Sequence, residues 1–238
     1  MENFSNWKEG MRDGLPIALA YFAVAFAFGI SAVGSGLLSH QATLMSFTNL
    51  TSAGQLAALG VIAASGSYLE MALTQLVINM RYLLMSCSLS QKIEPGAPFF
   101  HRYFVAAGVT DEIFAITSCR PGKFHPCYVY GAMSVTIPGW GLGTLCGSLS
   151  GTFMSAGLMS AFGIAIYGMF LAIIIPPTKK DHVVFKVVLL GMVLGSAFRF
   201  LPVLEKLSPG FSIIIITVVV AGLAAWLFPI AEEVSCES

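Results

Sequence analysis

Acidic side chains occur inside apolar stretches of this 238-residue chain, where each charge costs about 2.5–3.5 kcal/mol on membrane-insertion scales. Asp111 and Glu112 lie about eight residues into the apolar segment 103–118, or roughly 12 Å along a helix. That depth is near the middle of a membrane, where a carboxyl group can take up a proton at neutral pH. Since adjacent helix positions point about 100° apart, the two acids cannot easily share one partner. We therefore expect either proton coupling at this pair or a structural carboxylate that pairs with an arginine on a neighbouring helix.

A second group of polar residues follows the segment 68–89, which is the most polar of the long apolar segments. On a helical wheel they form two stripes on nearly opposite faces. A helix that is polar on two sides should lie inside a bundle rather than face lipid. We predict that Arg81 pairs with an acid, Asp111 or Glu112 first, unless it extends to the membrane surface. The stripes are Glu70, Thr74, Arg81 and Ser88 on one face, with Glu70 a further candidate for proton coupling or an ion pair, and Gln75, Asn79 and Ser86 on the other.

The stretch 46–55 is too polar to face lipid, yet it leads directly into the short apolar stretch 56–64. In a membrane, irregular backbone survives only inside the protein or along a cavity. A short, interrupted helix is therefore the best sequence indication of a transporter's binding site. The alternative is an extramembrane loop followed by a short helix. The predicted substrate-binding residues are Asn49, Gly54 and Gln55 from this stretch, with Asn79 and Arg81 in support.

Four glycines recur at every fourth position in the segment 128–153. Glycines at that period form one smooth helix face, which lets another backbone approach closely. We predict helix packing at this face, by a helix of the same chain or of another. The four are Gly139, Gly143, Gly147 and Gly151.

The composition excludes several classes of protein. Apolar residues make up 56% of the chain and charged residues 10%, with a mean hydropathy of +0.82. A soluble domain usually has about 25% charged residues. The net charge is zero, so nucleic-acid binding has no electrostatic basis. The five cysteines are odd in number and irregularly spaced, which indicates no disulfide framework.

No pattern of catalytic or metal-binding residues is persuasive. The chain lacks a phosphate-binding Gly-x-x-x-x-Gly-Lys-Ser/Thr motif. Cys119, His125 and Cys127 fit no common zinc spacing, and a fourth ligand is missing. We therefore expect no enzyme activity, no metal and no cofactor.

The long apolar segments must position the polar residues. A helix needs about 20 apolar residues to cross a membrane. The predicted fold is an all-α integral membrane protein, a polytopic bundle of about seven to eight transmembrane helices with one short or interrupted. A cytoplasmic segment (1–13) precedes a single transmembrane transporter domain (14–229), and a short polar tail (230–238) follows it. The segments are 14–38, 68–89, 103–118, 128–153, 158–175, 183–201 and 211–228, with 46–64 as the weak eighth.

Eight spans would place both termini on the same side of the membrane. With the N-terminus inside, the lysines and arginines of the loops lie mostly on the cytoplasmic side, as the positive-inside rule requires. If 46–64 is re-entrant, the later loops change sides and this bias reverses. Both orientations remain open.

Several short motifs occur in a fixed order from about residue 10 to residue 230. In order and spacing they resemble the AzlC family, the large subunits of branched-chain amino acid exporters. The motifs are Gly14-Leu-Pro16, Tyr21, Phe28-Gly29, Ala53-Gly-Gln55, Asn79-Met-Arg-Tyr82, Asp111-Glu112 and Trp140-Gly-Leu-Gly-Thr144.

The resemblance implies export of leucine, isoleucine, valine and toxic analogues across the bacterial cytoplasmic membrane. It also implies a small AzlD-like membrane subunit as partner, which would suit the face of Gly139 to Gly151. One departure concerns the segment 158–175, where family members often have an acid followed by Phe and Ala. This chain has Ser160-Ala-Phe-Gly-Ile-Ala165 instead, without an acid.

The functional prediction is a proton-coupled secondary transporter that exports small apolar amino acids. One alternative is the permease component of an ATP-driven importer, although such a subunit needs a cytoplasmic coupling helix and these loops are short. Another is a scaffold or an intramembrane enzyme, but a scaffold has little reason to hold acids and an arginine at this depth.

Overall fold

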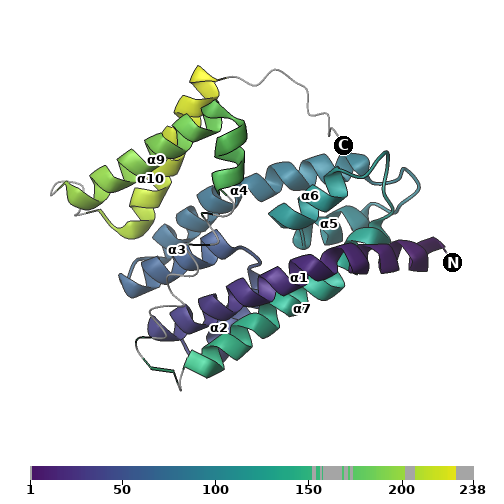
Figure 1. Ribbon diagram of the computed structural model, residues 1–238, viewed down its shortest axis with the longest axis horizontal. Coiled ribbons are helices and arrows are strands. Elements are labelled where there is room, and N and C mark those ends of the chain that lie inside the picture. The colour runs from purple at the N-terminus through teal and green to yellow at the C-terminus, as the bar shows by residue number, and fades with distance from the viewer. Residues whose placement is uncertain are drawn as a thin grey trace. The chain divides into compact units, whose positions relative to one another are not determined.

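A computed structural model describes residues 2–151, 154–155, 157, 168, 171, 174–201 and 207–228, and within these ranges the chain forms helices and no β-strand. Helices α1, α9 and α10 are long and apolar enough to cross a membrane. The predicted all-α, membrane-type architecture is therefore confirmed. The helices are α1 (Glu2–Gly34), α2 (Ser39–Thr48), α3 (Ser52–Ala63), α4 (Tyr68–Lys92), α5 (Phe100–Ala107), α6 (Asp111–Ser118), α7 (Pro126–Gly151), α9 (His182–Phe200) and α10 (Pro209–Leu227) (Figure 1).

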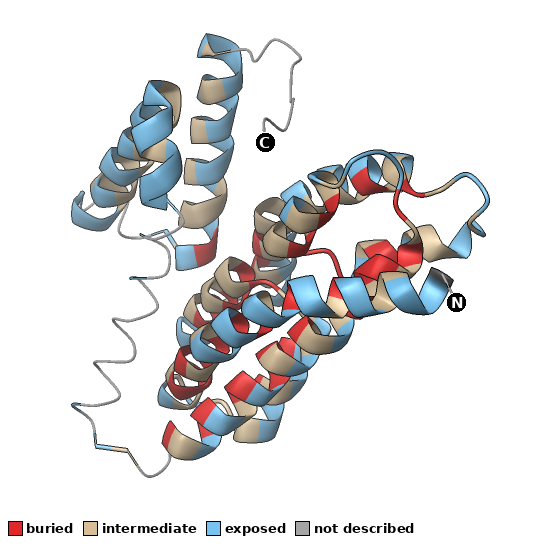
Figure 2. Cartoon of the chain, turned by 45° about the vertical axis from the view of Figure 1, so that its right-hand side comes forward, coloured by how far each residue is buried: buried red, intermediate tan, exposed pale blue. Residues whose placement is uncertain are grey.

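The chain divides into two compact units. The first comprises residues 1–55 and 79–163, and the second comprises residues 56–78 and 164–238. Helices α3 and α4 each contribute to both units. In the second unit α9 packs against α10, and of the residues in these two helices only Gly210 is buried (Figure 2). Apolar faces of this size on helices of this length are typical of lipid-facing surfaces.

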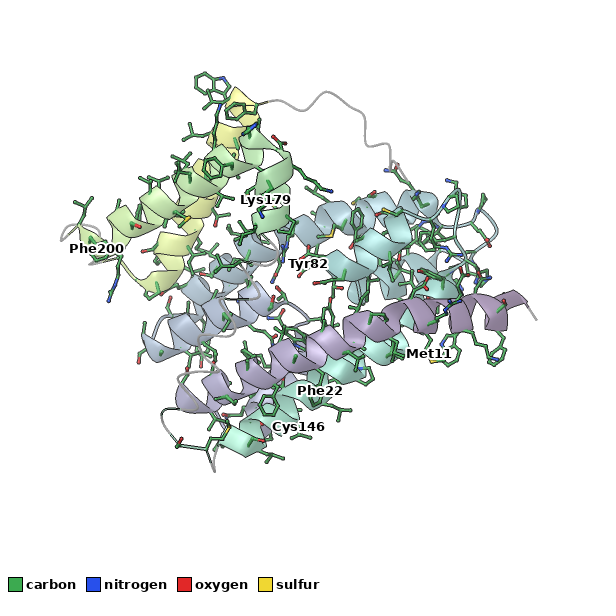
Figure 3. The ribbon with its side chains drawn as sticks, in the orientation of Figure 1. Met11, Phe22, Tyr82, Cys146, Lys179 and Phe200 are labelled. Carbon is green, nitrogen blue, oxygen red and sulfur yellow. The ribbon has the colours of Figure 1, made fainter. Side chains whose placement is uncertain are left out.

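Helices α1 and α7 lie side by side and form the core of the first unit (Figures 1 and 2). Their backbones are so close that a Cβ atom on Gly147 would lie 2.0 Å from the Phe26 carbonyl oxygen. A Cβ on Gly143 would lie 2.5 Å from the carbonyl oxygen of Phe22, a residue labelled in Figure 3. The glycine face is therefore covered by a helix of the same chain. The other two glycines are less closely packed. A Cβ on Gly139 would lie 2.8 Å from the Ala18 oxygen, and a Cβ on Gly151 would lie 3.5 Å from Ile30 Cα.

The polar start of α1 is helical and packs on the beginning of α7. Arg120, in the loop before α7, forms a two-pronged ion pair with Glu9, at 2.8 and 3.0 Å. Its guanidinium lies 4.0 Å from the centre of the Tyr128 ring, and the Tyr128 hydroxyl donates to Asp13 at 2.8 Å. The hydrogen bond with Glu9 raises the pKa of Arg120. These contacts explain why α1 begins about three turns before the predicted apolar segment.

Two pairs of helices are each joined by a break of three residues. The chain is not helical between α2 and α3, at 49–51, nor between α5 and α6, at 108–110. Thr51 and Thr110, the last residue of each break, are both buried. The first break agrees with the predicted interrupted helix. The second corrects the prediction of one continuous helix over 103–118.

The remaining predicted segments have close counterparts in α4, α7, α9 and α10. Most of the predicted segment 158–175, with Ser160-Ala-Phe-Gly-Ile-Ala165 inside it, lies outside the described residues, as does the tail 230–238.

Candidate functional site

The break between α2 and α3 is held by buried polar side chains. The Gly54 N–H lies 3.3 Å from the Thr51 hydroxyl, which thus caps the first turn of α3. Gln55 follows in the same turn and is fully buried. Its side-chain amide nitrogen donates to the Ser46 hydroxyl at 2.9 Å, and Ser46 in turn lies 2.7 Å from the hydroxyl of Thr144 on α7. The two sides of the break are therefore joined to each other and to α7.

Trp140 completes the partners of Gln55. Its indole Nε1–H donates to the side-chain oxygen of Gln55 at 3.0 Å, and both residues are almost fully buried. A buried hydrogen bond that loses one partner leaves the other unsatisfied, at a cost of about 1–3 kcal/mol. Gln55 was predicted to contact substrate, but its amide oxygen and nitrogen both bond inside the protein. In this structure it supports the break.

The break between α5 and α6 has a similar construction. The Thr110 hydroxyl lies 3.3 Å from the Ile113 N–H and caps α6. The Tyr21 hydroxyl, from α1, lies 2.7 Å from that same oxygen and also contacts the carboxylate of Glu112. Since Glu112 lies in the first turn of α6, Tyr21 joins α1 to the start of this half-helix.

Tyr21 and Trp140 connect the two breaks. Their rings meet edge to face with centres 5.2 Å apart, and both residues are buried. Leu50, inside the first break, packs against the buried cluster that this pair forms with Ala25. Tyr21 contacts Thr110 at the second break, and Trp140 bonds to Gln55 at the first. We call the following seven residues the break network: Tyr21, Ser46, Gln55, Thr110, Glu112, Trp140 and Thr144.

An ion pair lies beside the second break. Arg81 Nη2 is 2.9 Å from Asp111 Oδ2, so the structure contains the predicted pairing of Arg81 with an acid. The same nitrogen lies 3.3 Å from the hydroxyl of Tyr82, which is labelled in Figure 3, and the guanidinium stacks over the Tyr82 ring. Both charged side chains are 45% exposed. They are therefore accessible to a small solute.

This arrangement is suited to binding a small zwitterion. A half-helix N-terminus carries unpaired N–H groups and a partial positive charge, which favour a carboxylate. The starts of α3 and α6 both lie in the first unit. Arg81 and Asp111 add one charge of each sign. Acids at the start of α6 can also exchange a proton with the solute or with water.

Glu70 has a different environment from the other predicted acids. It is buried in the second unit, where its carboxylate accepts the Gly210 N–H at 2.9 Å and the Ser208 hydroxyl. It thus caps the start of α10. Among the described residues no cation pairs with it. Thr74, one turn along α4, is fully buried and its hydroxyl has no hydrogen-bond partner in the described part of the chain.

The other predicted site residues lie on α2, α3, α4 and α7. Asn49 is the C-terminal cap of α2, and Gly54 is buried in the first turn of α3. Asn79 is half-buried on α4, about half a turn before Arg81. Gly139 to Gly151 face α1, so that face is not open to a separate subunit.

Tyr21, Thr110 and Trp140 were not among the predicted site residues. Tyr21 and Trp140 contributed only to the family resemblance, because their partners are 85–91 positions away and no short spacing reveals them. Thr110 had a readable signal. Gly108, then a threonine followed by two acids, is a typical end and restart of a helix.

Metal and cofactor sites have no candidate in the described ranges. No three His, Cys, Asp or Glu side chains there lie close enough to hold a metal ion.

Comparison with known proteins gives the family. A model described as AzlC protein matches residues 16–154, which include both breaks and the break network. The chain is 30% identical over 179 residues to an uncharacterized membrane protein of Archaeoglobus fulgidus, covering 74% of this chain and 78% of that one. It is 26% identical over 207 residues to the inner membrane protein YgaZ of Escherichia coli, covering 84% of each.

A membrane protein of Helicobacter pylori is 23% identical over 152 residues, covering 63% of this chain and 66% of that one. No solved structure matches the chain. The matched relatives are named membrane proteins, which agrees with the apolar helices, and the family indicates a role related to membrane transport. The chain belongs to the AzlC family.

Proposed function

We propose that this protein is the large subunit of a secondary transporter that exports branched-chain amino acids across the bacterial cytoplasmic membrane, coupled to protons. It would cross the membrane about seven to eight times and act with a small AzlD-like subunit. It would need no cofactor and would catalyse no chemical reaction.

The observation that carries this proposal is the pair of short breaks between helices, at 49–51 and 108–110, which both lie in the first unit. Transporters commonly bind their solutes at discontinuous helices, where half-helix ends meet the charged groups of the substrate. Here one break leads into Gly54, and the other leads into Asp111 beside Arg81. The substrate's carboxylate would lie at the start of α3, and its ammonium near Asp111.

The membership in the AzlC family supports the choice of branched-chain amino acids. The ATP-driven importer has weaker support. Apart from the two breaks, the described loops from α1 to α7 are four to seven residues long, and none of them contains a coupling helix for an ATPase; they are 35–38, 64–67, 93–99 and 119–125.

Asp111→Asn tests the site assignment. Export of labelled valine or leucine from cells that express the protein with its small partner should fall by about tenfold or more, because a charge that pairs with both Arg81 and the substrate is lost. Glu9→Gln is the matched control, since Glu9 also pairs with an arginine, at 2.8 Å, but far from both breaks in sequence. Equal export by the two variants, at equal protein levels, would show that Asp111 is not part of the site.

A further inference from the structure

The break network contains one hydroxyl whose hydrogen bonds depend on a neighbouring proton. The Tyr21 oxygen contacts both Thr110 and Glu112, but a phenol has only one hydrogen to donate. When Glu112 is ionised, its carboxylate can only accept, so Tyr21 donates to it and Thr110 donates to Tyr21. When Glu112 is protonated, its hydroxyl can donate to Tyr21, and Tyr21 then donates to Thr110. Both arrangements give the Tyr21 hydrogen an acceptor and the Tyr21 oxygen a donor.

The two arrangements differ at the cap of α6. Thr110 also accepts the Ile113 N–H. In the protonated arrangement it accepts two hydrogen bonds, whereas in the ionised one it accepts one and donates one. The strength of the cap therefore depends on the proton at Glu112.

The Tyr21 ring connects this change at the α6 cap to the α2–α3 break. Tyr21 is packed edge to face on Trp140, whose indole N–H holds Gln55 at the start of α3. In a close-packed interior a tilt of one ring is transmitted to its neighbour. We infer that Tyr21 is a positioning residue whose hydrogen bonds change with the protonation of Glu112 and which couples the α5–α6 break to the α2–α3 break.

The inference rests on the proposed function, since it assigns the coupling proton to Glu112. In the described part of the chain, the titratable groups next to Glu112 are Tyr21 from α1 and Asp111, and these two in turn interact with Tyr82 and Arg81 from α4. The groups that meet Tyr21 from α7 and from the breaks, Trp140 and Thr110, are neutral. Asp111 is already engaged by Arg81, which leaves Glu112 as the acid that Tyr21 contacts directly.

The first test is the pH profile of valine export by vesicles that contain the protein and its small partner. Tyr21→Phe keeps the ring but removes the donor to the ionised carboxylate, so the midpoint should move to higher pH by about one unit. Glu112→Gln should abolish that pH dependence. The control is Tyr130→Phe, which removes the 2.7 Å contact between Tyr130 and His101 and should keep the wild-type profile. Identical profiles for the two phenylalanine variants would overturn the inference.

A second readout does not depend on transport. With Trp7→Phe and Trp226→Phe, Trp140 becomes the one tryptophan in the chain. Its emission should change with pH, and Tyr21→Phe should remove the change. If valine is not exported but the emission still titrates in this way, the proposed function fails and the inference stands. An emission that is the same at all pH values would contradict the inference even where export is observed.

Thr110 provides a test if Tyr21→Phe does not fold. Thr110→Ser keeps the hydroxyl and the cap and should retain the wild-type pH profile. Thr110→Val has a similar shape but no hydroxyl, so its profile should differ from that of Thr110→Ser. Equal profiles for the serine and valine variants would exclude a role for this hydroxyl in coupling.

Discussion

Individual acids in this protein differ in what surrounds them, and that difference assigns their roles. Asp111 pairs with Arg81 at a half-exposed position, whereas Glu112 bonds to Tyr21 inside the break network. Glu70 accepts hydrogen bonds from a helix start in the second unit. A solute can reach Asp111, the proton at Glu112 can be sensed by Tyr21, and Glu70 acts on the structure of α10.

The role of Glu70 leads to a prediction on stability. Glu70→Ala removes the acceptor for the Gly210 N–H and the Ser208 hydroxyl, which should cost about 1–2 kcal/mol, as loss of a helix cap does. Glu70→Gln keeps an acceptor oxygen and should cost less, because only the charge at the helix start is lost. Thermal unfolding in detergent measures both.

Glu94→Ala is the control for Glu70→Ala, because Glu94 lies beyond the end of α4 and no side-chain hydrogen bond of its carboxylate is found in the described part of the chain. If Glu70→Ala and Glu94→Ala unfold at the same temperature, Glu70 does not stabilise α10.

At the scale of helices, hydropathy predicts length well and interruption poorly. The break at 49–51 was predictable because a polar run surrounds it. The break at 108–110 has only a short signal, Gly108 followed by Thr110 and two acids, and a single glycine is tolerated in membrane helices. The end of α5 depends on the contacts that α6 makes through Thr110 and Tyr21. Those contacts join residues 89 positions apart, so no local pattern contains them.

The packing of α1 on α7 was likewise half predictable. The period of the glycines predicted a close contact, but not the partner helix. That partner also supplies small residues, Gly10, Gly14 and Gly29, whose Cβ atoms would meet the backbone of α7 within 3 Å. Since both helices contribute, the pattern on α7 alone could not identify α1.

Two glycines of that face make a matched pair for a packing test. Gly147→Ala would place a Cβ 2.0 Å from the Phe26 oxygen, so α1 and α7 must separate, at a cost of about 1–3 kcal/mol or more. Gly151→Ala meets its nearest atom at 3.5 Å, an ordinary contact. Folded yield and thermal unfolding in detergent should fall for the first variant and stay near wild type for the second.

Equal stability of these two alanine variants would mean that α1 does not approach α7 as closely at Gly147 as it does in the structure.

On the scale of the whole molecule, the residues assigned to the candidate site lie in the first unit. The break network and the Arg81–Asp111 ion pair all lie there. In the second unit α9 and α10 present apolar, mostly exposed faces. Such faces require lipid or another apolar partner. This distribution agrees with one site for a small solute within a membrane protein.

The most direct measurement of the central claim is counterflow of labelled leucine and valine in vesicles that contain the protein and its small partner. The account predicts that vesicles preloaded with unlabelled leucine accumulate labelled leucine and valine, and that those with Asp111→Asn do so much more slowly. Charged amino acids should not exchange. No counterflow of any branched-chain amino acid, by protein shown to be folded and together with its partner, would contradict the account.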